Sequence, residues 1–468
     1  MKSYYRGAWQ SSDRRLESLN PYTDIPFEDL HLFELKHLDG AIDSLRKGAG
    51  ALNSLRREEL HQIFTRLHGI LEAKKHEFAK LISTEQGKVI TEARIEVDSA
   101  ISSIELLVDN PFMIGPRILP LSREASFGDR LGYTLRHPHG VVAIITANPQ
   151  PFVIPLVHSV FALAAGNAVA LKPSIHTSVM VLKLVEVLLE TGFPAESVAC
   201  FIGSGKTIGR ELVQHPGINH VIAAGSLKTL YDIRSRMGFI TSQLQWGCVA
   251  TCIVGKSANL DRVVDELLRV SFECSGQAAF TPTWVACFDQ KYDELRERLQ
   301  ARLNEMVCGD PLQEETQIGP LTEKKKVERL ERRLSEEIAK GAEIVAGGRI
   351  DKQLYQPMLL DRCDLKKTKF SSREIGAPII GLTKIRKAAD AITLLKSQRQ
   401  HVLTLFSKDQ DWASRQAVKM PFNNVHINGI PNWRDGLICI PGQPTRTGRR
   451  TSEDRINDMS HIRDIIFH

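Results

Sequence analysis

GVVAIIT, residues 140–146, decides the fold class, because it is a continuous apolar run rich in β-branched residues. Such a run is typical of a strand buried on both faces, as in a parallel sheet. A helical stretch from about residue 155 to residue 165 follows it. Strand-like and helix-like segments then alternate: NAVALKPS at 167–174, SVMVLKLVEVLLETG at 178–192, SVACFIG at 197–203 and HVIAAGS at 220–226. The alternation predicts an α/β protein with a parallel sheet and crossover helices.

Length and composition place the chain among globular proteins of two or three domains. It has 468 residues, of which 42% are hydrophobic and 25% charged, and its formal net charge is +6. These proportions are average, and the charge is mild for this length. The sequence has no Lys/Arg cluster interleaved with aromatic residues, so no nucleic-acid partner is expected.

Neither export nor membrane insertion is expected. The first twenty residues lack the apolar core of a signal peptide. The most apolar region, residues 141–171, is interrupted by Pro149, Pro151 and Pro155. Prolines at this density fit buried strand, loop and helix better than a membrane span. A cytoplasmic protein is therefore expected.

Two further patterns are set aside. The eight cysteines show no repeated spacing, and Cys248 and Cys252 lack a second ligand pair, so we expect reduced thiols and no metal site. GSGKT at 203–207 suggests a phosphate-binding loop, but that motif needs a glycine where this chain has Cys200. A turn between strand and helix is the better interpretation.

Six segments, in order, resemble the NAD(P)-dependent aldehyde dehydrogenase superfamily. They are spread over most of the chain and match the family's strands, turns and loop motifs. The segments are RHPHGVVAIIT at 136–146, ALAAGNAVALKPS at 162–174, GSGKTIGRELVQHPGINHVIAAGS at 203–226, CGDPLQEETQIGP at 308–320, REIGAPII at 373–380 and NNVHIN at 423–428.

The resemblance implies an α/β fold with a Rossmann-like cofactor domain, an α/β catalytic domain and a β-arm for oligomerisation. The cofactor-binding domain is expected at residues 1–121 and 139–244, and the catalytic-type domain at 245–430. The arm and tail are expected at 122–138 and 443–468. Members of this family commonly form dimers or tetramers, so a homo-oligomer is expected.

Aldehyde oxidation of this kind requires a thiolate nucleophile and a general base that activates water. The family's nucleophile follows the pattern Gly-Gln-x-Cys. Here that pattern places Ala279 at the nucleophile position, and a methyl group can neither ionise nor attack a carbonyl. Gln245 occupies the position of the family's general-base glutamate, and an amide accepts no proton at neutral pH. Branches of the superfamily that transfer the acyl group to CoA also lack that glutamate, because the CoA thiol resolves the thioester instead. The loss of the glutamate is therefore weaker evidence than the loss of the thiol.

Two further residues bear on the chemistry. The family's oxyanion asparagine aligns with ANPQP, so Asn148 either donates to an oxyanion or caps a turn. Cys274 stands five residues before Ala279 and is expected on the helical approach to the loop. Five helical residues span roughly 7.5 Å, which is too far for Cys274 to replace the missing thiol directly. A buried, inert thiol is the alternative interpretation.

The resemblance also implies residues that bind NAD or NADP. Lys172 matches the lysine that holds the adenosine ribose hydroxyls, and Ser174 lies beside it. Ser226, after Gly225, is expected at a helix N-terminus that receives the pyrophosphate. Glu374 matches the glutamate that binds the nicotinamide ribose. Three departures favour weaker binding: Leu230 replaces a glycine, Ala223–Ala224 replace Phe-Thr, and Gly376 replaces a phenylalanine.

These observations favour an aldehyde dehydrogenase-fold protein that has lost thiol catalysis. Its role would be to bind a dinucleotide or another small ligand, or to serve as a partner subunit. One alternative is an active divergent enzyme for an aldehyde-like substrate, CoA-acylating or not, that uses Cys274 or another thiol. A purely structural subunit is a third interpretation, which binding measurements with NAD and NADP would separate from the first.

Overall fold

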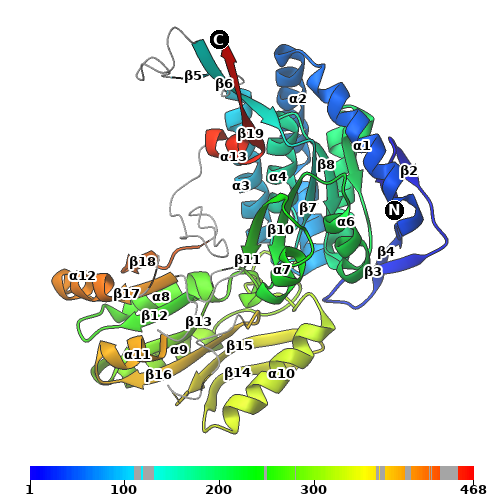
Figure 1. Ribbon diagram of the computed structural model, residues 1–468. Coiled ribbons are helices and arrows are strands. Elements are labelled where there is room, and N and C mark those ends of the chain that lie inside the picture. Colours follow the sequence, from blue (N-terminus) through cyan, green and yellow to red (C-terminus); the bar gives the residue numbers. More distant parts are fainter. Residues whose placement is uncertain are drawn as a thin grey trace.

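The computed structural model describes residues 1–109, 117–119, 131–246, 250–279, 281–364, 368, 375–395, 402–420, 422, 424–432 and 452–467. These residues form two seven-stranded sheets, a three-stranded sheet and a two-stranded sheet (Figure 1). The predicted α/β class is confirmed. No helix of the described chain is long and apolar enough to cross a bilayer.

The first large sheet has the order β11-β10-β7-β8-β9-β1-β2. Its parallel core confirms four predicted strands: β7 (Val141–Ile145), β8 (Ala168–Lys172), β9 (Val198–Cys200) and β10 (His220–Gly225). A fifth parallel strand, β11 (Thr241–Trp246), was not predicted. Two short N-terminal strands, β1 (Ser3–Tyr5) and β2 (Ala8–Gln10), continue it in antiparallel fashion.

Both faces of this sheet are covered, which explains the continuous apolar runs in its strands. One face packs against α2 (Arg57–Gln86), α3 (Ile90–Asp109), α4 (Val153–Ala164) and α5 (Ser178–Glu190). The other packs against α1 (Leu38–Asn53), α6 (Arg210–Gln214) and α7 (Leu227–Arg234). Within β7, Val142 and Ile144 face the first layer, and Val141 and Ala143 face the second. The GSGKT segment forms a single turn before α6, as expected.

The second large sheet has the order β14-β15-β16-β13-β12-β17-β18. Its strands are β12 (Ala250–Val254), β13 (Pro282–Phe288), β14 (Glu343–Asp351), β15 (Leu354–Asp361), β16 (Ile379–Ile385), β17 (Val402–Phe406) and β18 (Asn424–Ile427). One face carries α8 (Leu260–Ser271) and α9 (Asp289–Asn304). The opposite face carries α10 (Lys324–Ile338), α11 (Ala388–Leu395) and α12 (Gln410–Lys419).

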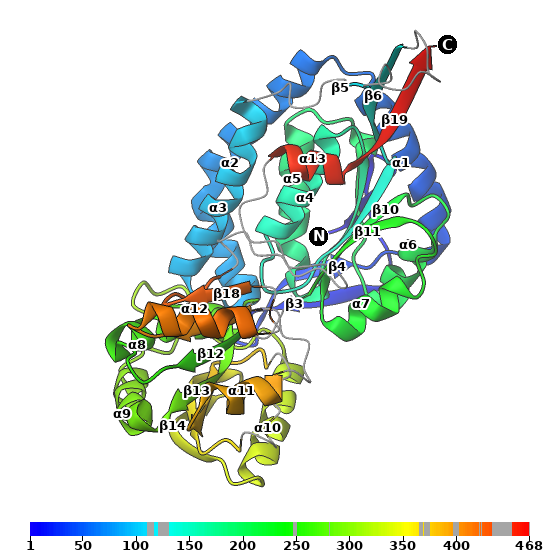
Figure 2. The same ribbon diagram turned by 60° about the vertical axis from the view of Figure 1, so that its left-hand side comes forward.

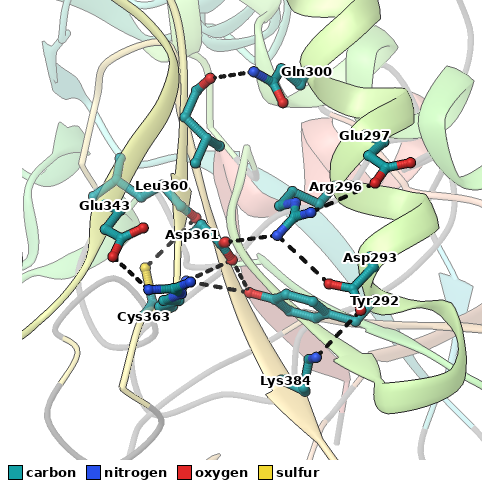
Figure 3. Close-up of polar contacts among 12 residues, drawn as sticks. Tyr292, Asp293, Arg296, Glu297, Gln300, Glu343, Leu360, Asp361, Cys363 and Lys384 are labelled. Atoms are coloured by element: carbon teal, nitrogen blue, oxygen red, sulfur yellow. Dashed lines mark hydrogen bonds and ion pairs between the residues drawn. The ribbon is translucent and has the colours of Figure 1, made fainter.

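A buried polar network joins α9 to the end of β15 (Figure 3). Asp361 is 2% exposed and accepts hydrogen bonds from the Tyr292 hydroxyl, from Arg296 Nη1 at 3.3 Å and from the Arg362 backbone N–H at 2.8 Å. The Lys384 ammonium lies over the Tyr292 ring, 4.7 Å from its centroid. The network lies at the carboxyl end of β15 and fixes α9 against the second sheet.

The third sheet projects from the body, far from the second large sheet in both views (Figure 1, Figure 2). It consists of β5 (Arg117–Ile118), β6 (Leu131–Pro138) and β19 (Ser460–Phe467), with β19 preceded by α13 (Ser452–Asp458). The described parts of the expected arm (122–138) and tail (443–468) therefore pair with each other, over eight residue pairs of β6 and β19. Residues 122–130 and 443–451 lie outside the described residues. The two-stranded sheet joins β3 (Arg15–Leu19) to β4 (Pro26–His31).

Candidate active site

The candidate site lies where the carboxyl ends of the first sheet's parallel strands meet the loop before β13. Successive strands β7, β8 and β9 run to one side, whereas β10 and β11 lie on the other side of β7. Ligands of open α/β sheets bind at such a reversal of strand order. Residue pairing places Ile145 level with both Lys172 and Ala223, so the ends of β7, β8 and β10 share one edge.

Lys172 ends β8 with its side chain buried. The residue is 4% exposed, and its ammonium donates to the Pro173 carbonyl at 2.8 Å. Burial lowers the pKa of Lys172 to about 8. A cation with few fixed partners at a ligand-binding edge is available to a polar ligand.

Gly225 and Ser226 join β10 to α7. Ser226 is the N-cap of α7, and its hydroxyl accepts a hydrogen bond from the Thr229 backbone N–H at 3.3 Å. A Cβ added to Gly225 would lie 3.7 Å from Thr229 Cβ, so packing within the chain does not require glycine there. Leu230, on the inner face of α7, is 1% exposed and belongs to the apolar core.

Asn148 is already paired within the chain. Its side-chain oxygen accepts a hydrogen bond from the Ser174 hydroxyl, and its amide donates to Glu323, the N-cap of α10. Glu323 also lies 3.6 Å from His176, measured from Oε2 to Nε2. Asn148 therefore bridges the β8 end of the first sheet and the start of α10. Glu323 engages one of the two amide hydrogens, so an oxyanion would have to use the other.

The loop around Ala279 keeps its scaffold. Gly276 has φ +71°, and a Cβ there would lie 2.1 Å from the Ala377 carbonyl oxygen, so only glycine fits. The Gln277 side-chain oxygen accepts from the Thr322 backbone N–H at 3.1 Å and from Lys326 Nζ at 2.8 Å. Ala279 packs against the apolar cluster on the first sheet. The Gly-Gln pair thus ties the loop to the second sheet and α10.

Cys274 does not lie on a regular helix, in contrast to the expectation. α8 ends at Ser271, and both Cys274 and Ser275 adopt left-handed backbone angles, with φ of 51° and 54°. Cys274 is 2% exposed, and its sulfur accepts a hydrogen bond from Gln86 Nε2 at 3.3 Å. Burial raises the pKa of Cys274 to about 12, so the thiol stays protonated at neutral pH.

Buried polar groups from the α2–α3 region support this loop. Gln86 Nε2 also donates to the Asn148 carbonyl at 2.6 Å. Lys88 donates to the Pro149 carbonyl at 2.9 Å and forms a fully buried ion pair with Glu96. The backbone at Asn148 and Pro149 is therefore held by two donors that come from the end of α2 and the turn after it.

Gln245 faces an imidazole. Its amide nitrogen lies 3.3 Å from His158 Nε2, and His158 comes from α4. The predicted general-base position thus holds an amide beside an imidazole ring. The described residues contain no group of three or more His, Cys, Asp and Glu side chains that could hold a metal ion.

Two polar atoms near this edge, Thr146 Oγ1 and Gln150 Nε2, are buried without a hydrogen-bond partner in the described structure. Both follow β7, at the edge that also carries Lys172 and Ser226. Buried orphans of this kind are rare without a ligand or water. Glu374, the expected nicotinamide-ribose residue, lies outside the described residues.

Sequence reasoning missed Gln86, Glu323 and His158. Gln86 ends α2, Glu323 precedes α10, and each could pass for an ordinary helix-terminal residue. His158 sits within an apolar helix, where a lone histidine is the only available signal. Their roles come from contacts between residues 87 to 188 positions apart in the sequence, and no local pattern encodes these contacts.

Comparison with known proteins places the chain in one protein family. The Aldehyde dehydrogenase family matches residues 9–465. The chain is 26% identical to 3-sulfolactaldehyde dehydrogenase of Priestia megaterium, over 99% of this chain and 97% of the relative. It is 26% identical to lactaldehyde dehydrogenase of Methanocaldococcus jannaschii, over 98% of this chain and 99% of the relative.

Solved structures share the fold. The NADP-dependent glyceraldehyde-3-phosphate dehydrogenase of Bacillus halodurans, complexed with NADP, superposes with a TM-score of 0.93 at 22% identity, covering 100% of this chain and 98% of that one. Glyceraldehyde-3-phosphate dehydrogenase GapN of Methanocaldococcus jannaschii, also complexed with NADP, gives 0.88 at 24% identity, covering 97% and 100%. The resemblance seen in the sequence is thereby confirmed: the chain belongs to the aldehyde dehydrogenase family.

Proposed function

We propose that this chain is a member of the aldehyde dehydrogenase family that has lost thiol catalysis and binds a dinucleotide or another small ligand, alone or as a partner subunit. One observation carries the proposal. The loop that would hold the nucleophile keeps its Gly276 and Gln277 contacts, but its nucleophile position is Ala279. The neighbouring thiol, Cys274, is buried, and its pKa is raised to about 12.

NAD or NADP is the proposed ligand of the first sheet. Lys172 would hold ribose hydroxyls, and Ser226 with the start of α7 would receive the pyrophosphate. Thr146 and Gln150 offer unpaired buried atoms at the same edge. Both solved relatives described above contain NADP. A bound nicotinamide would supply a hydride acceptor, and this chain's own residues would bind and orient it.

The second ligand is proposed to be aldehyde-like. The curated relatives are named as dehydrogenases of 3-sulfolactaldehyde and lactaldehyde. In this chain the carbonyl group of such a ligand would lie next to the Ala279 methyl group and the Asn148 amide. One hydrogen of that amide already donates to Glu323. Without a thiolate no covalent intermediate forms, so binding rather than turnover is expected.

Calorimetry and mass spectrometry test the proposal together. We expect NAD or NADP to give binding heat, and a panel including lactaldehyde and 3-sulfolactaldehyde to yield neither NAD(P)H nor an acyl adduct. Ala279→Cys is the matched variant, because it restores the thiol in an intact loop and should acquire the adduct that the wild type lacks. A stoichiometric acyl adduct on the wild-type chain would overturn the proposal.

The enzyme alternative is an active dehydrogenase, CoA-acylating or not, that uses Cys274 or another thiol. Cys274→Ser discriminates, since loss of a measured wild-type activity with the fold intact would establish this alternative. Absence of any binding heat with NAD and NADP would instead favour a purely structural subunit.

Several features of the whole chain belong to the same proposal. The cofactor-binding domain is assigned to residues 1–121 and 139–244, the catalytic-type domain to 245–430, and the arm and tail to 122–138 and 443–468. We further propose a cytoplasmic homo-oligomer, a dimer or a tetramer, that assembles through the arm.

A further inference from the structure

Four histidines gather where the projecting sheet joins the body. We call His137, His139, His220 and His461 the histidine clasp. The rings of His139 and His220 stack with centroids 4.7 Å apart and an interplanar angle of 7°. His461 lies 5.8 Å from His139 and 5.2 Å from His137, centroid to centroid. No residue of the clasp belongs to the candidate active site.

The clasp joins three strands that are distant in sequence. His137 lies on β6, His220 begins β10 in the first large sheet, and His461 lies on β19. His461 and His137 are direct cross-strand partners in the antiparallel pairing of β19 with β6. His139, just after β6, contacts both His220 and His461. The clasp therefore connects the C-terminal strand to the body through imidazole rings.

The clasp is built for neutral rings. His220 is 3% exposed, its Nδ1 pairs with Thr241 Oγ1 at 2.7 Å, and its Nε2 has no hydrogen-bond partner within the described residues. A charged imidazolium there would lack the second acceptor that it needs. His139 Nε2 lies 3.2 Å from the Asp458 carbonyl, so α13 covers this ring.

Few charges nearby could compensate protonation. Besides the clasp itself, the titratable side chains that the structure describes on the packed elements are Tyr133 and Arg136 on β6, Arg463 and Asp464 on β19, Arg455 and Asp458 on α13, and His158 on α4. Arg136 donates to the Asn457 carbonyl, and Arg455 lies over the Phe161 ring. Among the described residues of β7, β10 and β11, His220 is the titratable group.

We propose that the histidine clasp is a pH-sensitive lock that holds α13 and β19 against the body at neutral pH and releases them when its rings are protonated. Like charges directly opposite each other across two strands destabilise their pairing. His137 and His461 would become such a pair, and His139 and His220 would carry like charges on stacked rings.

The direction of the pH effect follows from the folded-state pKa values. Burial lowers the pKa of His139, and it lowers the pKa of His220 to about 3. The pKa of His461 is lowered by desolvation and by the nearby His137 ring. Docking therefore has its full strength above pH 6.5 and weakens as the pH falls below it, because the clasp rings bind protons more readily once α13 and β19 are released. Each proton taken up weakens docking by up to about tenfold per pH unit.

Hydrogen–deuterium exchange of the intact chain tests the lock. We compare protection of residues 460–467 at pH 7.5 and pH 5.5, corrected for intrinsic exchange, with β8 as the internal reference for global unfolding. Protection of β19 in the wild type should fall by about ten- to a hundredfold at pH 5.5, for one or two protons gained. The double variant His139→Gln/His461→Gln should retain its protection, and His76→Gln, an exposed histidine of α2, should behave as wild type.

Two results would overturn the lock. One is equal protection of β19 at both pH values in the wild type, and the other is a loss in the double variant as large as in the wild type. If the double variant misfolds, His461→Gln alone decides, because His461 is exposed and its replacement should reduce the loss of protection severalfold.

Discussion

At the scale of single residues, the loop before β13 contains residues that hold its shape and a different residue at the predicted nucleophile position. Gly276 is fixed by the Ala377 carbonyl, and Gln277 is fixed by Thr322 and Lys326, so both residues serve the fold whether or not a nucleophile follows. Ala279 has no such partner and packs only against apolar neighbours. The contacts that hold the loop therefore do not use the side chain at position 279.

Lys172 gives the first prediction. Because burial lowers the pKa of Lys172 to about 8, its ammonium is increasingly lost above that pH. The affinity for an anionic dinucleotide should therefore fall as the pH rises through 8, by at most about tenfold per pH unit. Lys172→Met should weaken binding by about 1.5–3 kcal/mol, the range for a hydrogen bond to a charged group, and should remove this pH dependence. Calorimetry from pH 6.5 to 9.5 measures both effects.

Lys80→Met is the matched control, since Lys80 is exposed on α2 and far in sequence from the β8 edge. It should bind as the wild type does at every pH. An unchanged affinity in Lys172→Met would show that the ammonium does not contact the dinucleotide.

Motifs in the sequence predict only some of the candidate residues. Lys172 and Ser226 could be predicted from the family's motifs, and the structure places both at the ends of parallel strands of the first sheet, which share one edge. Gln86, Glu323 and His158 could not, because they reach Cys274, Asn148 and Gln245 from distant helices. Their roles depend on how α2, α4 and α10 pack, and this packing is a tertiary property.

At the scale of elements, the docking of α9 on β15 depends on one buried carboxylate. Tyr292→Phe removes the hydroxyl that donates to Asp361 and leaves the Arg296 and Arg362 donors in place. Removing one partner of a buried charged acceptor should lower the unfolding free energy by about 1–3 kcal/mol. Urea denaturation measures the change, with Tyr22→Phe, a half-buried tyrosine outside the network, as the control. A Tyr292→Phe chain as stable as the control would mean that Arg296 and Arg362 suffice.

Glu85 makes the α2–α5 contact pH-dependent. It is 2% exposed near the end of α2 and accepts from the backbone N–H groups of Val179 and Met180, at 2.7 and 2.8 Å. Burial raises the pKa of Glu85 to about 8, so the folded chain keeps a proton that the unfolded chain releases above its ordinary pKa of 4.5. Unfolding free energy should therefore fall between pH 4.5 and 8, by up to about 1.4 kcal/mol per pH unit.

Glu85→Gln should flatten this slope, because an amide carries no proton to release. Urea midpoints at pH 5, 6, 7 and 8 provide the comparison, and Glu77→Gln, exposed on the same helix, should keep the wild-type slope. Identical slopes in all three chains would assign the pH dependence to other groups.

At the scale of the whole molecule, alternating strands and helices suffice to predict the layers but not the second sheet's connections. The runs at β7, β8 and β10 are almost continuously apolar because helices cover both faces of the sheet. Such uninterrupted runs, in place of alternating apolar and polar residues, indicate a parallel sheet. β14 instead is largely exposed at the sheet edge and joins β15 in antiparallel fashion. The pairing of β6 with β19 links residues more than 300 apart, and only tertiary structure reveals which segment the tail meets.

The projecting sheet carries the last prediction. β19 is one of its edges and offers unpaired backbone groups to another chain. Ile462 and Ile466, on one face of this strand, are 57% and 42% exposed, and Ile118 on β5 is 80% exposed. Apolar side chains along an edge strand favour association, so light scattering should give a mass at least twice the 52.4 kDa of one chain.

Ile462→Lys/Ile466→Lys should reduce that mass to a single chain, because two ammonium groups on the edge would have to be buried or brought close to their symmetry mates. Val418→Lys places the same charge on α12, where Val418 is 89% exposed, and should leave the mass unchanged. The histidine clasp adds a second test, because β19 is both the edge expected to associate and the strand that the clasp holds. Lowering the pH to 5.5 should therefore dissociate the wild-type oligomer, as the two lysine substitutions should at pH 7.5. A wild-type chain that is monomeric at pH 7.5, or a double lysine variant that keeps the wild-type mass, would show that the chain does not assemble through the arm.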